Sequence, residues 1–377
     1  MTKNQIVRTI AFSLVVVIMM LILCDFFKLG NDKNFDKYFY SFRKYPENSI
    51  DAVFIGTSGF DRYWMPAMAY EKYGMVSYPL CADAQPAWLI TNVIEEAQTY
   101  HDPQLFVIDI RCFTQDNNAD LMDVRARRIL DAVPFFSKSR LKIAFKTMQM
   151  IHEYDESKPR FDLSYILPFI KYHSMWETEG LGVLGNLGNR KQNYGGFYLT
   201  KKLSMRIRPQ TPIAYDASYT MELDPLSEKT LYELFDYIRE NDLNVIFLDT
   251  PQFKDAHESG RANVIYDILE KEGFEYIHYY TAESDTGFSI NLDPNTDFYN
   301  EGHVNYYGAV KFTEVFAEYL NENHPLPDRR GDERISPHWD GVYKRIVETS
   351  ERIRVTLEEE ALLNAGEVIL DDEEEED

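Results

Sequence analysis

The sequence predicts an α/β protein built on a central parallel sheet. Five short apolar runs, each closed by small or polar turn residues, alternate with stretches whose apolar residues recur at helical spacing. Because such alternation produces βαβ units, the strands are expected to be parallel and covered by helices. Apolar residues make up 45% of the chain and aromatic residues 14%, which is enough for a large core.

Each expected element is set by a local pattern. Buried strands read as short continuous apolar runs, and proline at a first helical position or a 3.6-residue apolar period marks the helices. The expected strands lie within Asp51–Ser58, Val76–Cys81, Leu105–Ile110, Asn244–Thr250 and Tyr276–Tyr280. The expected helices are Pro66–Tyr73, Pro86–Tyr100, Leu226–Glu240, Ala262–Glu272 and Gly308–Leu320.

The alternation divides the chain into three parts. Residues 1–30 hold an apolar segment, residues 31–325 the main domain, and residues 326–377 a charged linker, an amphipathic helix and an acidic tail. Inside the main domain the pattern breaks over about residues 114–215, which is longer than a βα loop, so this stretch is read as a helical and irregular insertion.

The N-terminal segment is long enough for one transmembrane helix. Its uncharged centre, Thr9–Cys24, almost matches the span that a bilayer needs. A cleaved signal peptide and a lipoprotein box ending at Cys24 are the alternatives, but the bulky Leu23 suits neither cleavage site. We therefore expect a single-pass anchor. The lysines and arginines after the span outnumber those before it, which by itself favours a cytoplasmic body.

Composition excludes several classes of partner and cofactor. A net charge of −23, with no basic cluster interleaved with aromatic residues, argues against nucleic acid. Three cysteines form neither a metal motif nor a disulfide framework, although a bridge between Cys81 and Cys112 stays open. The histidines have no metal-ligand spacing and no nucleotide-binding glycine pattern occurs, so neither a metal nor another cofactor is expected.

Two motifs at strand ends could carry chemistry. Gly56-Thr57-Ser58-Gly59 permits a tight strand-to-helix turn that exposes the serine hydroxyl, although the same residues also suit a simple helix cap. His303 precedes the last helix of the main domain, in a polar loop where a histidine could equally be a surface residue. Since both loops fall at the carboxyl edge of the sheet, His303 is a candidate base for Ser58.

These two blocks resemble the SGNH/GDSL hydrolase family, in particular its membrane-anchored bacterial members. The family's Gly-x-Ser block falls on Gly56–Ser58 and its Asp-x-x-His block on Asn300–His303, and the likeness covers roughly Asp51 to Leu320. The resemblance implies a three-layer α/β/α, flavodoxin-like sandwich and a serine nucleophile. It also implies an extracytoplasmic body, against the charge count.

The sequence departs from the family pattern at two places. Asn300 stands where the family has the aspartate of its triad, so Asp297, Glu301 or a simple Ser–His dyad must take that role, and we expect Asp297. The Gly-x-Asn-Asp block that supplies the oxyanion asparagine is missing. Backbone N–H groups near Ser58 and Ala82, or the Arg111 guanidinium, would replace it, unless Arg111 is paired with Asp109 or Asp83.

The expected function is acyl transfer through Ser58. The resemblance implies an esterase or O-acyltransferase acting on acylated polysaccharide or teichoic acid of the cell envelope, with a multispanning membrane O-acyltransferase as a further partner. His173 and Trp176 in the insertion suit stacking on sugars, or ordinary packing. The alternative is a catalytically degenerate scaffold or glycan-binding protein, which Asn300 and the missing oxyanion asparagine favour.

Overall fold

A parallel five-stranded sheet forms the centre of the protein in the computed structural model, which describes residues 2–27, 33–115, 118–174, 177, 194–200, 215–284 and 286–374. The strand order is β2-β1-β3-β4-β5. The strands are β1 (Ala52–Ile55), β2 (Ser77–Pro79), β3 (Leu105–Asp109), β4 (Val245–Asp249) and β5 (Tyr276–His278). All five lie within the runs that the sequence predicts, so the α/β class with a flavodoxin-like parallel sheet is confirmed.

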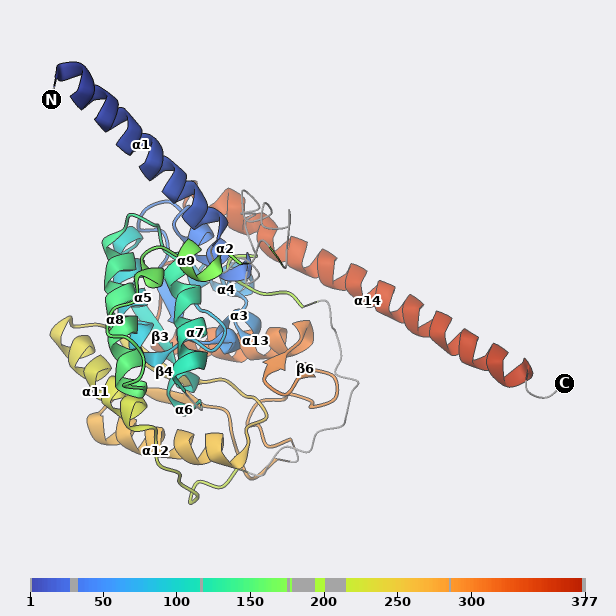
Figure 1. Cartoon of the computed structure of the whole chain (residues 1–377). Coiled ribbons are helices and arrows are strands. Elements are labelled where there is room, and N and C mark those ends of the chain that lie inside the picture. The colour runs from blue at the N-terminus through green and yellow to red at the C-terminus, as the bar shows by residue number, and fades with distance from the viewer. Residues whose placement is uncertain are drawn as a thin grey trace.

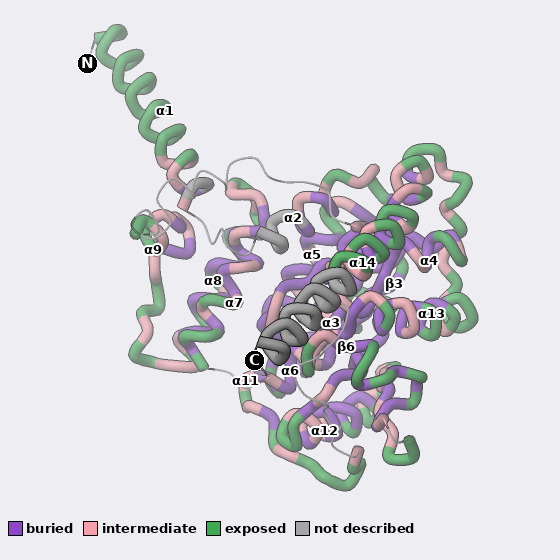
Figure 2. The backbone as a smooth tube through the Cα atoms, turned by 90° about the vertical axis from the view of Figure 1, so that its right-hand side faces the viewer, coloured by how far each residue is buried: buried purple, intermediate pink, exposed green. Residues whose placement is uncertain are grey.

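Helices cover both faces of this sheet (Figure 1), and Figure 2 shows the sheet region as the most buried part of the chain. On one face the Phe54 ring packs 4.7 Å from Trp64 and 6.0 Å from Phe316. On the other face Phe247 packs 5.8 Å from Phe235. Burial on both sides explains why the strands read as unbroken apolar runs. Helices α3 (Ser58–Tyr63), α4 (Pro66–Tyr73) and α13 (Tyr306–Asn323) lie on the first face, and α11 (Pro225–Glu240) lies on the second.

The predicted helices occur with small shifts and one large one. The single-turn helix η1 (Ala87–Leu89) precedes α5 (Ile90–Tyr100), where one continuous helix was expected. Helix α12 (Ala256–Glu272) begins six residues before its predicted start at Ala262. The cause is Asp255, whose side chain accepts a hydrogen bond from the Glu258 N–H at 2.8 Å and so caps the helix.

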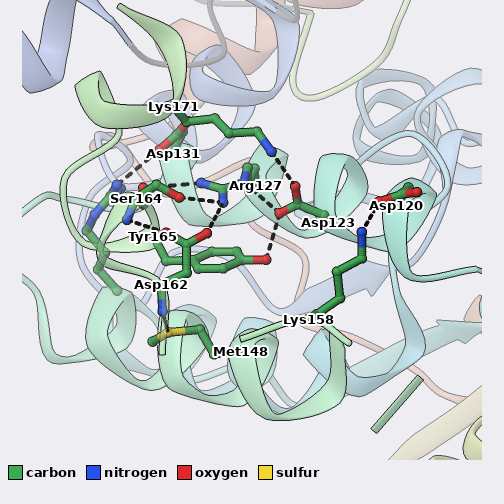
Figure 3. A network of polar contacts seen from close by, with 11 residues as sticks. Asp120, Asp123, Arg127, Asp131, Met148, Lys158, Asp162, Ser164, Tyr165 and Lys171 are labelled. Atoms are coloured by element: carbon green, nitrogen blue, oxygen red, sulfur yellow. Dashed lines mark hydrogen bonds and ion pairs between the residues drawn. The ribbon is translucent and has the colours of Figure 1, made fainter. Parts of the chain in front are cut away.

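The described part of the insertion after β3 is mostly helical between residues 118 and 174, and residues 194–200 form a turn with an isolated bridge between Tyr194 and Phe197. It holds α6 (Arg111–Thr114), α7 (Ala119–Ala132), α8 (Lys138–Tyr154), η2 (Leu163–Tyr165) and α9 (Phe169–Tyr172). The buried Arg127 fastens η2 and α9 to α7 (Figure 3). Its guanidinium donates to Asp123 at 2.6 Å and to the Ser164 carbonyl at 3.1 Å, and lies 3.8 Å from the Tyr165 ring. Lys171 adds an ion pair with Asp123 at 2.8 Å. These contacts pair and hydrogen-bond the buried Arg127 guanidinium, which would otherwise be unstable away from water.

Long helices occur at both ends of the chain. Helix α1 (Lys3–Phe26) has a mean hydropathy of 2.7 over Lys3–Cys24 and none of its most apolar window is buried, so it is one apolar helix that could be an anchor or a signal sequence. Helix α14 (Ser336–Glu374) packs beside α4 through the buried Trp339, Val342 and Ile346, then projects from the body (Figure 1). The helix therefore continues four residues into the acidic run that begins at Asp371. All three cysteines are free and buried, so the Cys81–Cys112 bridge is absent.

Candidate active site

Ser58 lies at the carboxyl end of β1, in a turn that is fastened to β3. A side chain on Gly56 would place its Cβ 2.1 Å from the Cβ of Asp109, so only glycine fits there. The Thr57 N–H donates to the Asp109 carboxylate at 2.9 Å, and the Thr57 hydroxyl accepts from the Gly59 N–H at 3.2 Å. Asp109 is fully buried, and burial raises the pKa of its carboxyl. The turn that carries Ser58 is therefore fixed at both strands.

His303 faces Ser58 from a short hairpin, β6 (Phe298–Asn300) and β7 (His303–Val304), where the sequence predicted a loop. Its Nε2 lies 2.7 Å from Ser58 Oγ. Its Nδ1 lies 2.8 Å from Asn300 Oδ1, which also accepts the Gly302 N–H at 3.0 Å. Because Oδ1 is an acceptor, these partners assign the proton to Nδ1 and leave Nε2 free to accept the Ser58 hydroxyl proton.

Asn300, and not Asp297, is the residue that the structure puts beside the imidazole. Asp297 is 2% exposed, and its carboxylate accepts the Asp293 N–H at 2.7 Å and pairs with Lys311 at 2.7 Å. These contacts stabilise the turn before β6 and connect it to α13. The Asp297 carboxylate therefore has a structural role. Glu301, the other carboxylate considered, is exposed. The Ser–His pair is thus oriented by a neutral amide.

Two guanidinium groups surround His303. Burial, Arg62 and Arg111 together lower the pKa of His303 to about 2. Arg62 is held by Asp61 at 2.7 Å and by the Tyr299 hydroxyl at 2.7 Å, and the Tyr299 ring stacks on the imidazole with centroids 5.6 Å apart. Among the described residues no carboxylate contacts the ring to stabilise an imidazolium, and the low pKa keeps the histidine neutral across the physiological pH range.

A cavity of about 360 Å³ opens beside Ser58. Its lining includes Arg111, Arg125 and Glu258. Ala84, which also lines it, has a φ of 51°, a backbone conformation that favours glycine. The N–H of Ala82, which the sequence suggested as an oxyanion donor, is already donated to the Gly56 carbonyl at 3.1 Å.

Arg111 faces this site without an ion pair in the part of the chain that the structure describes. Asp83 pairs instead with Arg62 at 3.3 Å, and Asp109 accepts the backbone N–H of Arg111 at 3.0 Å rather than its side chain. Arg111 Nη1 is buried without a hydrogen-bond partner, as are Thr250 Oγ1 and Gln252 Nε2. Other described residues, such as Trp88 and Trp339, also have a buried nitrogen without a partner, so these three atoms stand out by their place near the Ser–His pair.

These donors lie around Ser58 and His303. A Cβ built on Gly59 would be 2.9 Å from Thr250 Oγ1 and 3.3 Å from Arg111 Nη1, and one on Gly302 would be 3.6 Å from Arg111 Nη2. Two small residues, each adjacent to a member of the Ser–His pair, thus leave room for the donors to approach. Of Arg111, Thr250 and Gln252, only Arg111 also lines the cavity beside Ser58, so its guanidinium is the donor that a substrate oxygen there could reach.

The structure brings together only part of the predicted site. His173 follows α9, is exposed, and donates from Nδ1 to the Ile170 carbonyl of its own turn at 3.0 Å. It does not line the cavity beside Ser58. Trp176 lies outside the described residues. Another part of the insertion does reach the site, because the Tyr198 ring lies 4.5 Å from the Arg62 guanidinium.

Sequence reasoning missed Arg62, Tyr299, Thr250 and Gln252. Arg62 lies four residues after Ser58 in α3, so a helix after the serine turn places both on one side. Thr250 and Gln252 directly follow β4, where ligands of a parallel sheet gather, and this rule could have found them. No comparable sequence signal marks Tyr299.

Within the residues that the structure describes, no group of three or more histidine, cysteine or carboxylate side chains could hold a metal ion.

Comparison with known proteins gives no family: no family model matches the chain, and no curated protein matches it.

Proposed function

We propose that the protein is a serine esterase or O-acyltransferase with Ser58 as nucleophile and His303 as base. The observation that carries this proposal is the 2.7 Å contact of Ser58 Oγ with His303 Nε2, in the tautomer that accepts the hydroxyl proton. Nucleophile, base and a third orienting group in hydrogen-bond reach of one another are the arrangement that serine acyl transfer requires. Arg111, with its unpartnered Nη1 beside the pair, supplies a place for the oxyanion.

The mechanism has two halves. His303 Nε2 takes the Ser58 proton while Oγ attacks the ester carbonyl, and the oxyanion that forms is bound by the Arg111 guanidinium. The tetrahedral intermediate expels the alcohol, which takes the proton from His303, and leaves an ester on Ser58. Water or an acceptor hydroxyl then repeats the sequence on this ester, giving an acid or a new ester.

The resemblance to SGNH/GDSL hydrolases supports the substrate class. Membrane-anchored members of that family lead us to propose acylated polysaccharide or teichoic acid of the cell envelope as substrate, with a multispanning membrane O-acyltransferase as a partner. Under this proposal α1 stays in the membrane as a single-pass anchor and the body lies outside the cytoplasm. The 22-residue segment Lys3–Cys24, with a mean hydropathy of 2.7, is long enough for that span.

A non-catalytic scaffold or glycan-binding protein is the second candidate, and two observations favour it. The neutral Asn300 contacts the imidazole where a charged partner would support catalysis, and burial with two nearby arginines lowers the pKa of His303 to about 2. A histidine so hard to protonate is a weak base. In this reading the Ser58–His303 contact is an ordinary buried hydrogen bond.

Covalent labelling by a fluorophosphonate separates the two candidates. A serine activated by His303 should attack the phosphorus, and digestion with mass spectrometry should find the adduct on the peptide that contains Ser58. Ser58→Ala should abolish the adduct, whereas Ser218→Ala, which alters an exposed serine, should leave it unchanged. A folded wild-type protein that stays unlabelled would establish the scaffold reading instead.

Restoring the missing charge should accelerate the reaction. In Asn300→Asp a carboxylate would contact Nδ1, and an opposite charge at this distance raises a pKa by about one to three pH units. We expect kcat/KM for p-nitrophenyl acetate to rise by about tenfold to 10²-fold, since about 1.4 kcal/mol changes a rate tenfold. For the wild type, kcat/KM should not fall with decreasing pH until below pH 4. For Asn300→Asp, the pH at which kcat/KM begins to fall should be higher. Asn295→Asp, an exposed change nearby, is the control; an equal gain there would contradict the argument.

A further inference from the structure

A second cavity, of about 550 Å³, lies where α1 meets the body, away from Ser58. Leu21 and Cys24 from the end of α1 form part of its wall, and Arg43 and Lys44 follow α2 (Lys33–Phe42) in another part. The segment that joins α7 to α8 completes it with Phe136, and Arg140 lies in the first turns of α8. The cavity therefore has both cationic and apolar lining.

The place of this cavity follows from α1. The most apolar window of Lys3–Cys24 has no buried residue, so under the proposed anchoring these side chains contact acyl chains. Leu21 and Cys24 are within the last two turns of the helix, where a span leaves the hydrocarbon core and reaches the headgroups. The cavity is then at the level of the lipid headgroups.

The charges of the lining are mostly positive. Arg140 pairs with Asp131 at 3.0 Å, the one carboxylate of the lining, and Arg43 approaches Glu96 at 3.5 Å behind it. Lys44 is exposed, and its ammonium lies 5.2 Å from the centre of the Tyr40 ring, with no ion pair to any residue that the structure describes. The Lys44 ammonium is thus available to bind an anion.

Phe136 is an exposed apolar residue of the cavity lining. Its side chain is 78% exposed where it lines the cavity, and its ring lies edge-on to that of Phe135, with centroids 5.3 Å apart. A phenylalanine so exposed is costly in water but suits the interface between headgroups and acyl chains. Phe136 lines the same cavity as Leu21 and Cys24 at the end of α1.

We propose that this cavity binds the headgroup of an anionic phospholipid of the membrane that α1 crosses. The lipid phosphate meets Lys44, and the Phe136 ring enters the upper acyl region. The proposal rests on α1 remaining as the anchor, but not on the chemistry of Ser58, so fluorophosphonate labelling and lipid binding can fail separately. Binding of the headgroup would fix the orientation of the main domain relative to the bilayer.

Lipid retention tests the headgroup site. The full chain is reconstituted in nanodiscs of equal phosphatidylglycerol and phosphatidylcholine, released into mild detergent, and its bound lipids are counted by native mass spectrometry. Wild type should retain phosphatidylglycerol in preference, and Lys44→Glu should lower that retention by at least about tenfold, because the change replaces a cation by an anion at the lipid phosphate. Lys142→Glu makes the same change at an amine that pairs with Glu95 at 2.7 Å outside the cavity, and should match wild type. Equal retention in wild type and Lys44→Glu would overturn the proposal, as would a mature chain that lacks α1.

A tryptophan probe tests the depth of Phe136 independently. In Phe136→Trp the added fluorescence should be quenched by phospholipids brominated in the acyl chain. Tyr232→Trp is the control, because Tyr232 is 41% exposed on α11, a helix that lies apart from α1 in both Figure 1 and Figure 2. Quenching of the Phe136 probe no greater than that of the Tyr232 probe would show that this surface does not touch the bilayer.

Discussion

Replacing His303 by alanine is expected to lower the rate of Ser58 acylation by about 10⁴- to 10⁶-fold, the range found when a serine hydrolase loses part of its catalytic set. The hydroxyl of Ser58 has His303 Nε2 at 2.7 Å as its acceptor, and without it the alcohol must lose its proton to water. The rate of fluorophosphonate labelling and the turnover of p-nitrophenyl acetate measure this loss, with the melting temperature as a check of the fold.

The control for this prediction is another histidine with a polar partner. His324 lies 3.0 Å from Glu275 at the end of α13, so His324→Ala removes an imidazole without touching Ser58. Its labelling rate should stay within about twofold of wild type, as expected for surface changes of under about 0.5 kcal/mol. If His303→Ala labels as fast as His324→Ala, His303 is not the base.

The fold was predictable because its determinants are local. Buried strands such as Leu105–Asp109 are unbroken apolar runs, and Pro66 and Gly74 mark the first and last turns of α4 in the sequence itself. The start of α12 was missed because the apolar period begins later than the cap. Asp255 and Glu258 are a capping signal that does not depend on apolar residues.

The Ser58–His303 juxtaposition was also foreseeable, because the carboxyl ends of parallel strands share one edge. The residue that orients His303 could not be predicted from the sequence. Asn300 and Asp297 precede it by three and six residues, and the choice between them depends on the hairpin that turns Asn300 toward Nδ1. Asp297 is drawn away by Lys311, a partner 14 residues later on α13. Such a choice is made by tertiary contacts that spacing does not reveal.

The donors that surround the pair were hidden for a different reason. Thr250 and Gln252 directly follow β4, a place that the sequence does indicate, but only the structure shows that their polar side-chain atoms are buried without partners among the described residues. The loop that carries them is held by Tyr280, whose hydroxyl donates to the Thr250 carbonyl at 2.6 Å, and by Tyr63, which donates to the Pro251 carbonyl at 2.6 Å. A rigid frame thus keeps unsatisfied donors near the serine, which is costly for stability.

Arg111→Ala is expected to lower kcat for ester hydrolysis by about 10²- to 10³-fold, the usual cost of losing one oxyanion donor. The same change should raise the pKa of His303, because it removes one of the two cations that lower it. The rise in the pKa of His303 follows from removing the charge alone, so a fall in kcat beside it would report a separate loss.

The two readouts therefore have opposite consequences for catalysis, and together they isolate the role of Arg111. The His303 titration is followed by NMR of the imidazole, and kcat is measured in the same buffer. Arg125→Ala, which removes another arginine of the cavity lining, is the matched control. A higher pKa of His303 makes it a better base, so a rate that still falls must have lost stabilisation of the transition state. A rate that rises with the pKa would instead show that Arg111 acts on His303 alone, and that the oxyanion is bound by other donors at this edge of the sheet.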